Sequence, residues 1–538
     1  MTMPAEVELK LGIAPDDIPR LLRHRLVVSQ GQGRPRTVSL HNIYYDTPDL
    51  ALHRHRIALR LRRPGNGTRW IQTLKAEGRA VGGLHERPEW ETDTTEGVLC
   101  LDELPDAGLQ RFFSDPSLRA SLQPVFTMEF KRTIVQLAWA NGDAVELAVD
   151  RGHISADGRA QMLCELELEL KSGPPSRLFS VARMLHRSAP LRLSNVSKAQ
   201  RAYRMISGAT LEPQKAMPAP SAGDRKHLKT ANATTGELCA AVLAGGLAHL
   251  QANEEGARLS EDPSFVHQMR VATRRMRSAL KAFVPLLPPD QLEHFQEELR
   301  WLGDALSGTR NWDVFVSRSL PDICAALPDE AGLNWLATRA VEERGIQREH
   351  ARSAIESPRY QGLLLELGAW LATPRWQDAA AAQTPALRFG AEMLAKRHRK
   401  LKKYAGNLAG LDVHERHRLR IAGKKLRYAA EFFAPLCPGR RTTRYLDALE
   451  GLQNVLGDLN DEATTALLMQ QVSAGTGAPE HQRACGLVLG WASGLAREQL
   501  PAANKAWRIF TARKTFWPRY KNDGRKDGTD GKEAKGED

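Results

Sequence analysis

Polar and apolar residues alternate in two different ways along the chain. Up to about residue 205, short segments alternate at every second position, which is typical of β-strands with one apolar and one polar face. Beyond a proline-rich stretch at 211–225, apolar residues recur every three or four positions, which predicts helices. We therefore predict an α+β protein with a strand-rich domain at 1–210, a linker at 211–225 and an all-helical domain at 226–520. The final residues, 521–538, are rich in Gly, Lys and Asp and are predicted to be disordered.

The predicted strands of the first domain carry charges that are sorted by sign. Glu6, Glu8 and Lys10 share one face of the first strand. Arg60 and Arg62 share one face of a later strand, with leucines on the other face. The same spacing of two relates Arg87, Glu89 and Glu91, and again Glu165, Glu167 and Glu169, while Glu146 and Asp150 share one parity.

A solvated antiparallel sheet also alternates, but it usually mixes the two signs on its charged face. A closed barrel explains the sorting better, because leucines would face an outer layer of helices while the charges line a tunnel. Arginines and lysines in such a tunnel suit phosphates, and glutamates suit Mg²⁺ or Mn²⁺.

The composition indicates which kinds of partner and which cellular compartment to expect. The chain holds 76 Lys and Arg against 63 Asp and Glu, a formal net charge of +13, which favours polyanions. Six cysteines stand singly, without a CxxC pair, as expected of free thiols in a reducing cytosol. The N-terminus lacks the pattern of a signal peptide, and no apolar run reaches the roughly 20 residues of a membrane-spanning helix. We therefore expect a soluble, cytoplasmic protein without a membrane partner.

The strand motifs of residues 3–205 resemble the CYTH domain, the family of triphosphate tunnel metalloenzymes. The resemblance rests on the Glu-x-Glu-x-Lys start, Tyr-Tyr-Asp-Thr-Pro at 44–48, the Arg-x-Arg strand and the late Glu-x-Glu-x-Glu strand. It implies an eight-stranded antiparallel tunnel, with flanking helices, that processes triphosphates with Mg²⁺ or Mn²⁺. By position it implies Glu6, Glu8 and Lys10 as catalytic residues, Glu6, Glu8, Glu167 and Glu169 as metal ligands, and Arg60, Arg62, Lys75, Arg132 and Lys198 as triphosphate-binding residues.

The helical half contains an internal repeat. The segment at 267–277 recurs 150 residues later, at 417–427, and keeps the positions of its histidine and of its basic residues. Within each copy the basic residues keep helical spacing, and no glutamate lies inside either stripe. A solvated helix face would usually intersperse glutamates, so we interpret the stripes as a surface for a long polyanion. Its predicted members are His267, Arg270, Arg274, Arg277, His417, Arg420, Lys424 and Arg427.

These duplicated helices resemble the CHAD domain, over roughly residues 226–520. The resemblance implies two helical bundles related by pseudo-two-fold symmetry, whose basic faces bind inorganic polyphosphate. The role of the two histidines stays open, with phosphate contact or core hydrogen bonding favoured over a metal.

The leading functional hypothesis is a metal-dependent inorganic triphosphatase, because this hydrolysis needs charge neutralisation rather than covalent catalysis. Adenylate cyclase and thiamine triphosphatase share the tunnel but need a pocket for an organic group. A non-catalytic polyphosphate-binding protein would not need the glutamates. Nucleic-acid binding is less favoured, because interleaved aromatics and recognised base-reading motifs are lacking.

Overall fold

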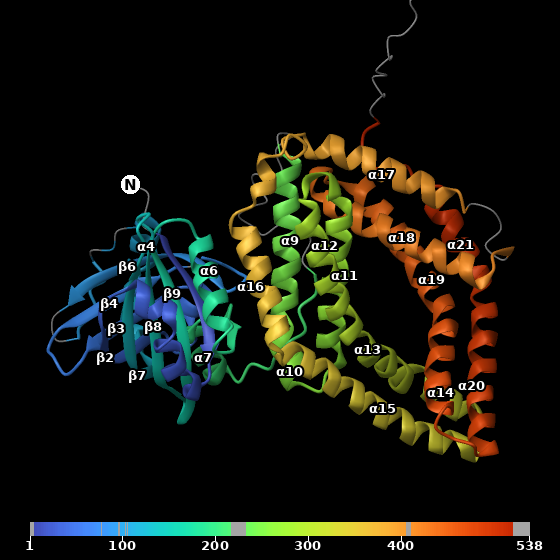
Figure 1. The fold of residues 1–538 in the computed structure, drawn as a ribbon, viewed down its shortest axis with the longest axis horizontal. Coiled ribbons are helices and arrows are strands. Elements are labelled where there is room, and N and C mark those ends of the chain that lie inside the picture. The colour runs from blue at the N-terminus through green and yellow to red at the C-terminus, as the bar shows by residue number, and fades with distance from the viewer. Residues whose placement is uncertain are drawn as a thin grey trace, which may run out of the picture.

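The computed structural model describes residues 5–519, apart from 77, 95–96, 103, 105, 217–232 and 405–409. It contains a strand-rich domain, blue to green in Figure 1, and a larger helical domain that continues to the C-terminal end of the described chain. The predicted linker at 211–225 lies partly outside the described residues, and the predicted tail at 521–538 lies wholly outside them. Within the described part, no helix combines the length and apolar character needed to cross a lipid bilayer.

The first domain is a closed antiparallel barrel of eight strands, which confirms the predicted fold class. Each strand pairs with the next in the order β1–β9–β8–β7–β2–β3–β4–β6, and β6 returns to pair with β1. Two short strands, β5 and β10, extend the sheet beside this closure. The strands are β1 (Ala5–Ile13), β2 (Gly31–Asp46), β3 (Ala58–Pro64), β4 (Trp70–Lys75), β5 (Arg79–Val81), β6 (Leu84–Thr94), β7 (Gln123–Ala138), β8 (Ala144–Ala156), β9 (Arg159–Ser172) and β10 (Leu191–Leu193).

The apolar faces of these strands point outward and are covered. Leu9 of β1 and Leu168 of β9 are fully buried in a cluster that includes Phe179 of the helix α6. On the far side, Leu59 and Leu74 pack in a separate cluster beneath short helices. The helices of this domain are α1 (Ile18–Leu22), α2 (Arg25–Gln30), α3 (Ala51–Arg54), α4 (Ala107–Phe112), α5 (Pro116–Ser121), α6 (Ser176–His186) and α7 (Lys198–Ser207).

The helical domain repeats a local pattern that matches the sequence repeat. The two repeated segments lie in α11 and α18, and each helix is followed by a short 3₁₀ turn and then by a further helix, α12 or α19. The helices are α9 (Thr235–Ala252), α10 (Glu254–Leu259), α11 (Pro263–Ala282), α12 (Pro289–Ala305), α13 (Ser307–Val314), α14 (Leu320–Ala326), α15 (Ala331–Glu356), α16 (Pro358–Ala372), α17 (Ala386–Lys402), α18 (Val413–Phe433), α19 (Arg440–Ser473), α20 (Pro479–Glu498) and α21 (Leu500–Thr511).

The two domains share one hydrophobic core. Helix α16 packs against α6 and β10 of the barrel domain, as Figure 1 shows for α16 and α6. A single buried cluster joins Phe179 and Leu193 of the barrel domain to Leu247 and Leu364 of the helical domain. At Gly368 the approach is so close that an added Cβ would lie 2.3 Å from the Phe179 ring. The domains are therefore joined by packing as well as by the chain.

Candidate active site

The charged faces of the strands meet inside the barrel, around a cavity of about 560 Å³. The antiparallel register places Glu8 of β1 opposite Glu169 of β9, and Lys10 opposite Glu167. Because side chains alternate along a strand, these four residues share the inner face. All the residues predicted to be catalytic, metal-binding or triphosphate-binding in the tunnel line this cavity, whereas Asp150 and Glu165 of the sorted acidic groups are not part of its described lining. The predicted residues in this lining are Glu6, Glu8, Lys10, Arg60, Arg62, Lys75, Arg132, Glu167, Glu169 and Lys198.

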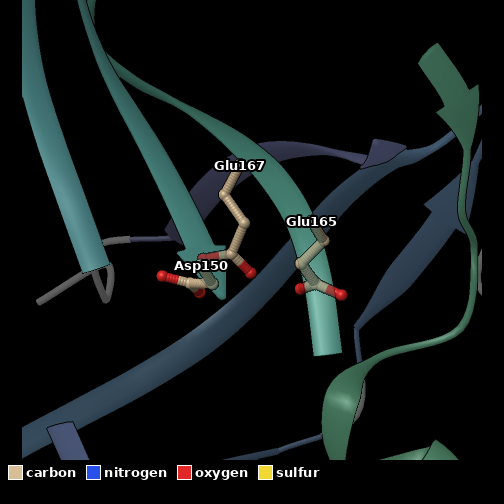
Figure 2. Close-up of side chains that lie close together, drawn as sticks. All are labelled: Asp150, Glu165 and Glu167. Atoms are coloured by element: carbon tan, nitrogen blue, oxygen red, sulfur yellow. The ribbon is translucent and has the colours of Figure 1, made fainter. Parts of the chain in front are cut away.

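One end of the charge network is built around Lys198, the first residue of α7. Its Nζ lies 2.8 Å from a carboxylate oxygen of Asp150 and 2.8 Å from one of Glu167, and it also pairs with Glu165. Figure 2 shows these three carboxylates together. Among the described residues, no other group of three or more Asp, Glu, His or Cys side chains lies close enough to share an ion. Burial disfavours the ammonium form, but the carboxylates outweigh it and raise the pKa of Lys198 above its usual range. An ammonium group therefore already lies among these carboxylates and offsets part of their charge.

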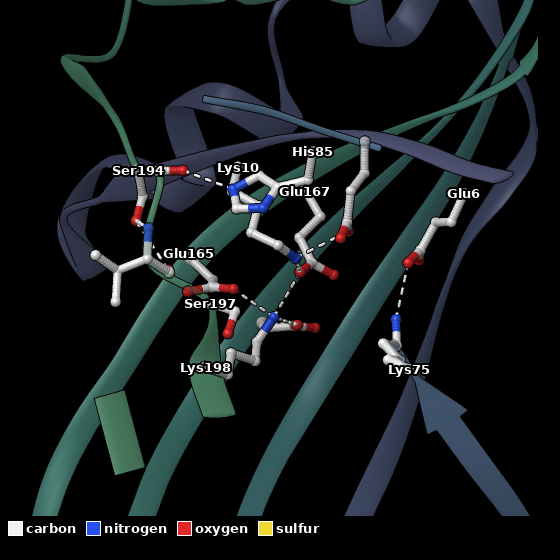
Figure 3. A network of polar contacts seen from close by, with 12 residues as sticks. Glu6, Lys10, Lys75, His85, Glu165, Glu167, Ser194, Ser197 and Lys198 are labelled. Carbon is white, nitrogen blue, oxygen red and sulfur yellow. Dashed lines mark hydrogen bonds and ion pairs between the residues drawn. The ribbon is translucent and has the colours of Figure 1, made fainter. Parts of the chain in front are cut away.

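A second centre lies on β1 itself. Lys10 pairs with Glu8, at 2.9 Å, and with Glu167, and Arg87 of β6 donates to Glu8 at 2.7 Å. Figure 3 shows Lys10 and Lys198 both directed at Glu167. Burial raises the pKa of Glu8, but Lys10 and Lys75 together outweigh that effect and lower it. Glu8 and Glu167 are consequently held as carboxylates although both side chains are buried.

A third centre lies around Glu169, which pairs with Lys171, and Glu6, which pairs with Lys75 at 2.8 Å. Burial raises the pKa of Glu169, and the nearby carboxylates of Glu6 and Glu146 raise it further, against the opposing effect of Lys171. Glu146 lies directly opposite Glu169 on β8. Hard carboxylate oxygens from β1, β8 and β9 that repel one another are the donor set that Mg²⁺ or Mn²⁺ prefers. Carboxylate oxygens of this kind suit a divalent cation at Glu169, whereas Glu167 is held mainly by lysine and arginine. As the side chains lie here, the oxygens of Glu6, Glu146 and Glu169 are too far apart to share one ion.

The opposite wall carries two arginines that differ in their pairing. Arg60 lies 3.5 Å from a carboxylate oxygen of Glu89 and 3.6 Å from one of Glu91. Arg62 donates to the side chain of Asn42, at 3.0 Å, and forms no ion pair with any described residue. Burial, followed by the charges of Arg60 and Arg132, lowers the pKa of Arg62 to about 10. The buried Nε of Arg60 lacks a hydrogen-bond partner among the described residues. This pair of guanidinium groups is suited to an anion with several oxygens.

Two cations outside the predicted site also line this cavity, Arg87 and Lys171. Arg87 lies opposite Glu6 on the adjacent strand and shares its inward parity with Glu89. That parity was visible in the sequence, but the sequence does not show that β6 pairs with β1 and so closes the barrel. Lys171 is 41% exposed and pairs with Glu169 at 2.6 Å, at the end of the charged wall.

In the helical domain, cations from the two repeats come together between α11 and α18. Burial, together with Arg274, Arg420 and Arg270, lowers the pKa of Lys424 to about 7. Burial and the charge of Arg274 lower the pKa of Arg270 to about 10. A cavity of about 890 Å³ adjoins these helices, and four predicted residues line it: His267, Arg274, Lys424 and Arg427.

The expectation that both stripes lack pairing carboxylates is wrong at Arg427. Its guanidinium pairs with Glu431, 2.9 Å away and one helical turn later, and with Glu450 of α19 at 2.7 Å. The reason is that Glu431 lies just beyond the repeated segment, on the same helix face. His417 is exposed, and neither it nor Arg277 belongs to the described lining of the cavity.

Comparison with known proteins matches both domains. The CYTH domain model matches residues 4–203, and the CHAD domain model matches residues 241–470. An inorganic triphosphatase of Haemophilus influenzae is 34% identical over 212 residues, which is 38% of this chain and 56% of that protein. This chain therefore matches only about half the length of that relative.

Two further relatives extend over the helical half. An uncharacterised protein of Mycobacterium tuberculosis is 26% identical over 532 residues, covering 93% of this chain and 95% of that protein. The crystal structure of the CHAD domain from the plant Ricinus communis is 31% identical, with a TM-score of 0.48, and covers 56% of this chain and 97% of that one. Together with the closed charged barrel and the duplicated helices, the two matching family models identify this chain as a CYTH domain joined to a CHAD domain.

Proposed function

We propose that the barrel hydrolyses inorganic triphosphate to diphosphate and phosphate, with Mg²⁺ or Mn²⁺ bound among its glutamates. The observation that carries this proposal is the separation of charge inside the cavity. Arg62 forms no ion pair with a described residue, the buried Nε of Arg60 has no described hydrogen-bond partner, and the carboxyl group of Glu169 lies near those of Glu6 and Glu146. A metal-bound polyphosphate supplies both missing partners, because it brings anionic oxygens and a cation together.

The chain's own residues have distinct roles in this proposal. Arg60, Arg62 and Lys75 would hold the phosphoryl oxygens and stabilise the charge that develops on them during transfer. Lys10 would keep Glu8 ionised and fixed. The Arg132 guanidinium, already bound to Asp150 at 2.7 Å, would orient the inner end of the cavity. Glu6, Glu8 and Glu169 would hold the divalent cation, which neutralises phosphate charge and lowers the pKa of a bound water.

The alternatives within this fold need room for an organic group. Fifteen of the twenty described lining residues are charged, and the large apolar side chains among them are Tyr44 and Phe130, so thiamine triphosphate and ATP are less favoured. A non-catalytic polyphosphate-binding protein would gain nothing from the repelling carboxylates around Glu169. The scattered free cysteines are in keeping with the cytoplasmic location that we propose.

For the helical domain, which we place at 226–520, the proposal is binding of inorganic polyphosphate between α11 and α18. The supporting observation is the cluster of Arg270, Arg274, Arg420 and Lys424: burial, and then the charges of the three arginines, lower the pKa of Lys424. A phosphate chain relieves the repulsion among these charges, since each residue could form a charge-assisted hydrogen bond.

The test is a phosphate-release assay on the full chain with triphosphate, ATP, thiamine triphosphate and long-chain polyphosphate, each with Mg²⁺, Mn²⁺ or chelator. We expect metal-dependent turnover that is fastest for triphosphate. Faster hydrolysis of a nucleotide, or release that persists in chelator, would contradict the proposal.

A further inference from the structure

The backbone of Lys10 lies at a break in the barrel's hydrogen bonding. On one edge, β1 pairs with β6 as far as Leu9 and with β10 from Leu11 onward, so Lys10 falls between the two partner strands. Its amide donates to the carbonyl oxygen of Gly83 at 3.0 Å, and its carbonyl oxygen accepts from the amide of Ser194 at 3.0 Å. The position of Lys10 on this edge therefore depends on a turn and a loop rather than on a strand.

The turn is the two-residue connection between β5 and β6. Gly82 and Gly83 have φ values of 64° and 79°, as a tight hairpin turn of this kind requires. The turn is pressed against the helical domain, since a Cβ on Gly82 would lie 3.3 Å from Leu247 of α9 and 3.4 Å from Gly368 of α16. The turn that holds the Lys10 amide is thus seated on the neighbouring domain.

The loop, residues 194–197, connects β10 to the helix that begins at Lys198. Within it, the Asn195 side-chain oxygen accepts from the Gly83 amide at 2.7 Å, which ties the loop to the turn. The carbonyl oxygen of Ser194 also contacts the His85 ring at 3.0 Å, and Ser197 caps the following helix. Figure 3 shows Ser194 and Ser197 beside the two lysines that meet at Glu167.

One side chain of the helical domain binds both the Gly82–Gly83 turn and the 194–197 loop. The carboxamide oxygen of Gln251, near the end of α9, accepts from the Gly82 amide at 3.0 Å and from the Asn195 side chain at 2.8 Å. We propose that Gln251 is a positioning residue for the tunnel: through Gly82 and Asn195 it fixes the backbone of Lys10 and the start of the Lys198 helix. This inference rests on the proposed triphosphatase function, and it makes the helical domain part of the active-site scaffold.

The chemistry of the contact supplies its own controls. Gln251→Glu keeps an oxygen that can accept both hydrogen bonds, whereas Gln251→Leu keeps much of the volume and removes the acceptor. Arg183→Gln serves as the interface control. It breaks an ion pair of 2.9 Å between Arg183 of α6 and Glu366 of α16, which is not one of the contacts that link Gln251 to Lys10. Asn195→Ala removes the inner link from the barrel side, should Gln251→Leu fail to fold.

The experiment combines hydrogen–deuterium exchange of the metal-free full chain with steady-state kinetics on triphosphate at saturating metal. For Gln251→Leu and Asn195→Ala we expect faster exchange in peptides covering 8–12 and 193–197, and a kcat lower by roughly tenfold, since each variant loses two partly buried hydrogen bonds. Gln251→Glu should restore both readouts to within about threefold of wild type, because its carboxylate oxygen still accepts both hydrogen bonds. Arg183→Gln should change neither.

Two outcomes would overturn the inference. One is unchanged exchange around Lys10 in Gln251→Leu; the other is changed exchange with kcat equal in Gln251→Leu and Gln251→Glu, which would mean that the contact only joins the domains. A wild-type chain without triphosphatase activity would refute the proposed function instead, and the exchange pattern would still decide whether Gln251 holds the Lys10 segment.

Discussion

Replacing Lys198 with methionine tests whether its ammonium group is what allows three carboxylates to be buried together. Asp150, Glu165 and Glu167 are 0%, 5% and 8% exposed, and all three pair with Lys198. Removing one partner of a buried ion pair costs about 3–5 kcal/mol, because the remaining charge stays desolvated. Arg132 still pairs with Asp150 and Glu167, so we expect the lower value.

The pH dependence gives the sharper test. In the wild type, burial raises the pKa values of Asp150 and Glu167, but their cationic partners outweigh it and lower them. A carboxyl group whose folded pKa is lowered contributes stability above its unfolded pKa, and that stability is lost on acidification. In Lys198→Met these carboxyl groups lose a cationic partner, so burial raises their pKa values above those in the wild type. The variant should therefore lose more stability at pH 8 than at pH 5, where protonation removes the buried charge.

The measurement is the thermal unfolding midpoint at pH 5 and pH 8, in chelator. A loss of about 3 kcal/mol corresponds to a midpoint lower by about 6–12 °C for a domain of this size. Lys171→Met is the matched control. The Lys171 side chain, which pairs with Glu169, is 41% exposed, and exposed ion pairs contribute about 0–1 kcal/mol to the free energy of unfolding. Equal losses in the two variants, or equal losses of Lys198→Met at both pH values, would refute the reasoning.

Three other predictions concern activity and binding. Glu8→Gln and Glu169→Gln should each remove most metal-dependent turnover while the chain stays folded, because a hard-cation site loses a ligand; near-wild-type rates at saturating metal would contradict this. Arg62→Met should raise KM for triphosphate by roughly tenfold or more, since a charge-assisted hydrogen bond contributes about 1.5–3 kcal/mol, and kinetics at fixed ionic strength would detect it. The pKa of Lys424 is about 7, and only its charged form attracts phosphate, so polyphosphate binding should tighten between pH 8 and pH 6. In Lys424→Met this tightening should be smaller. The same change in affinity with pH in the variant and the wild type would count against the binding site.

The sequence predicts the inner wall of the barrel well, because parity along a strand is a local property. Glu8 and Arg62 lie on inward parity whatever their partner strands are. Pairing is not local: the closure of β6 onto β1 brings Arg87 to Glu8, and alternation alone does not reveal it. The fold class was also predictable from local parity, because charges sorted onto one face of successive strands indicate a closed interior.

The contact between the domains could not be predicted from the sequence. Leu193 and Phe179 are apolar positions whose partners, such as Leu364, lie far along the chain in a domain of different periodicity. The helical repeat likewise predicts where the cations lie along each helix, but not which of them are neutralised. Arg427 finds a carboxylate on its own helix and another on α19, whereas Lys424 faces other cations.

The central claim is that the barrel cavity holds a polyphosphate and a divalent cation together. Anomalous diffraction from crystals grown with Mn²⁺ and a non-hydrolysable triphosphate analogue tests it most directly. The expected result is a manganese peak beside Glu169 and Glu8, with phosphate density against Arg60 and Arg62. Manganese and analogue bound only in the helical domain, with nothing ordered inside the barrel, would contradict the claim.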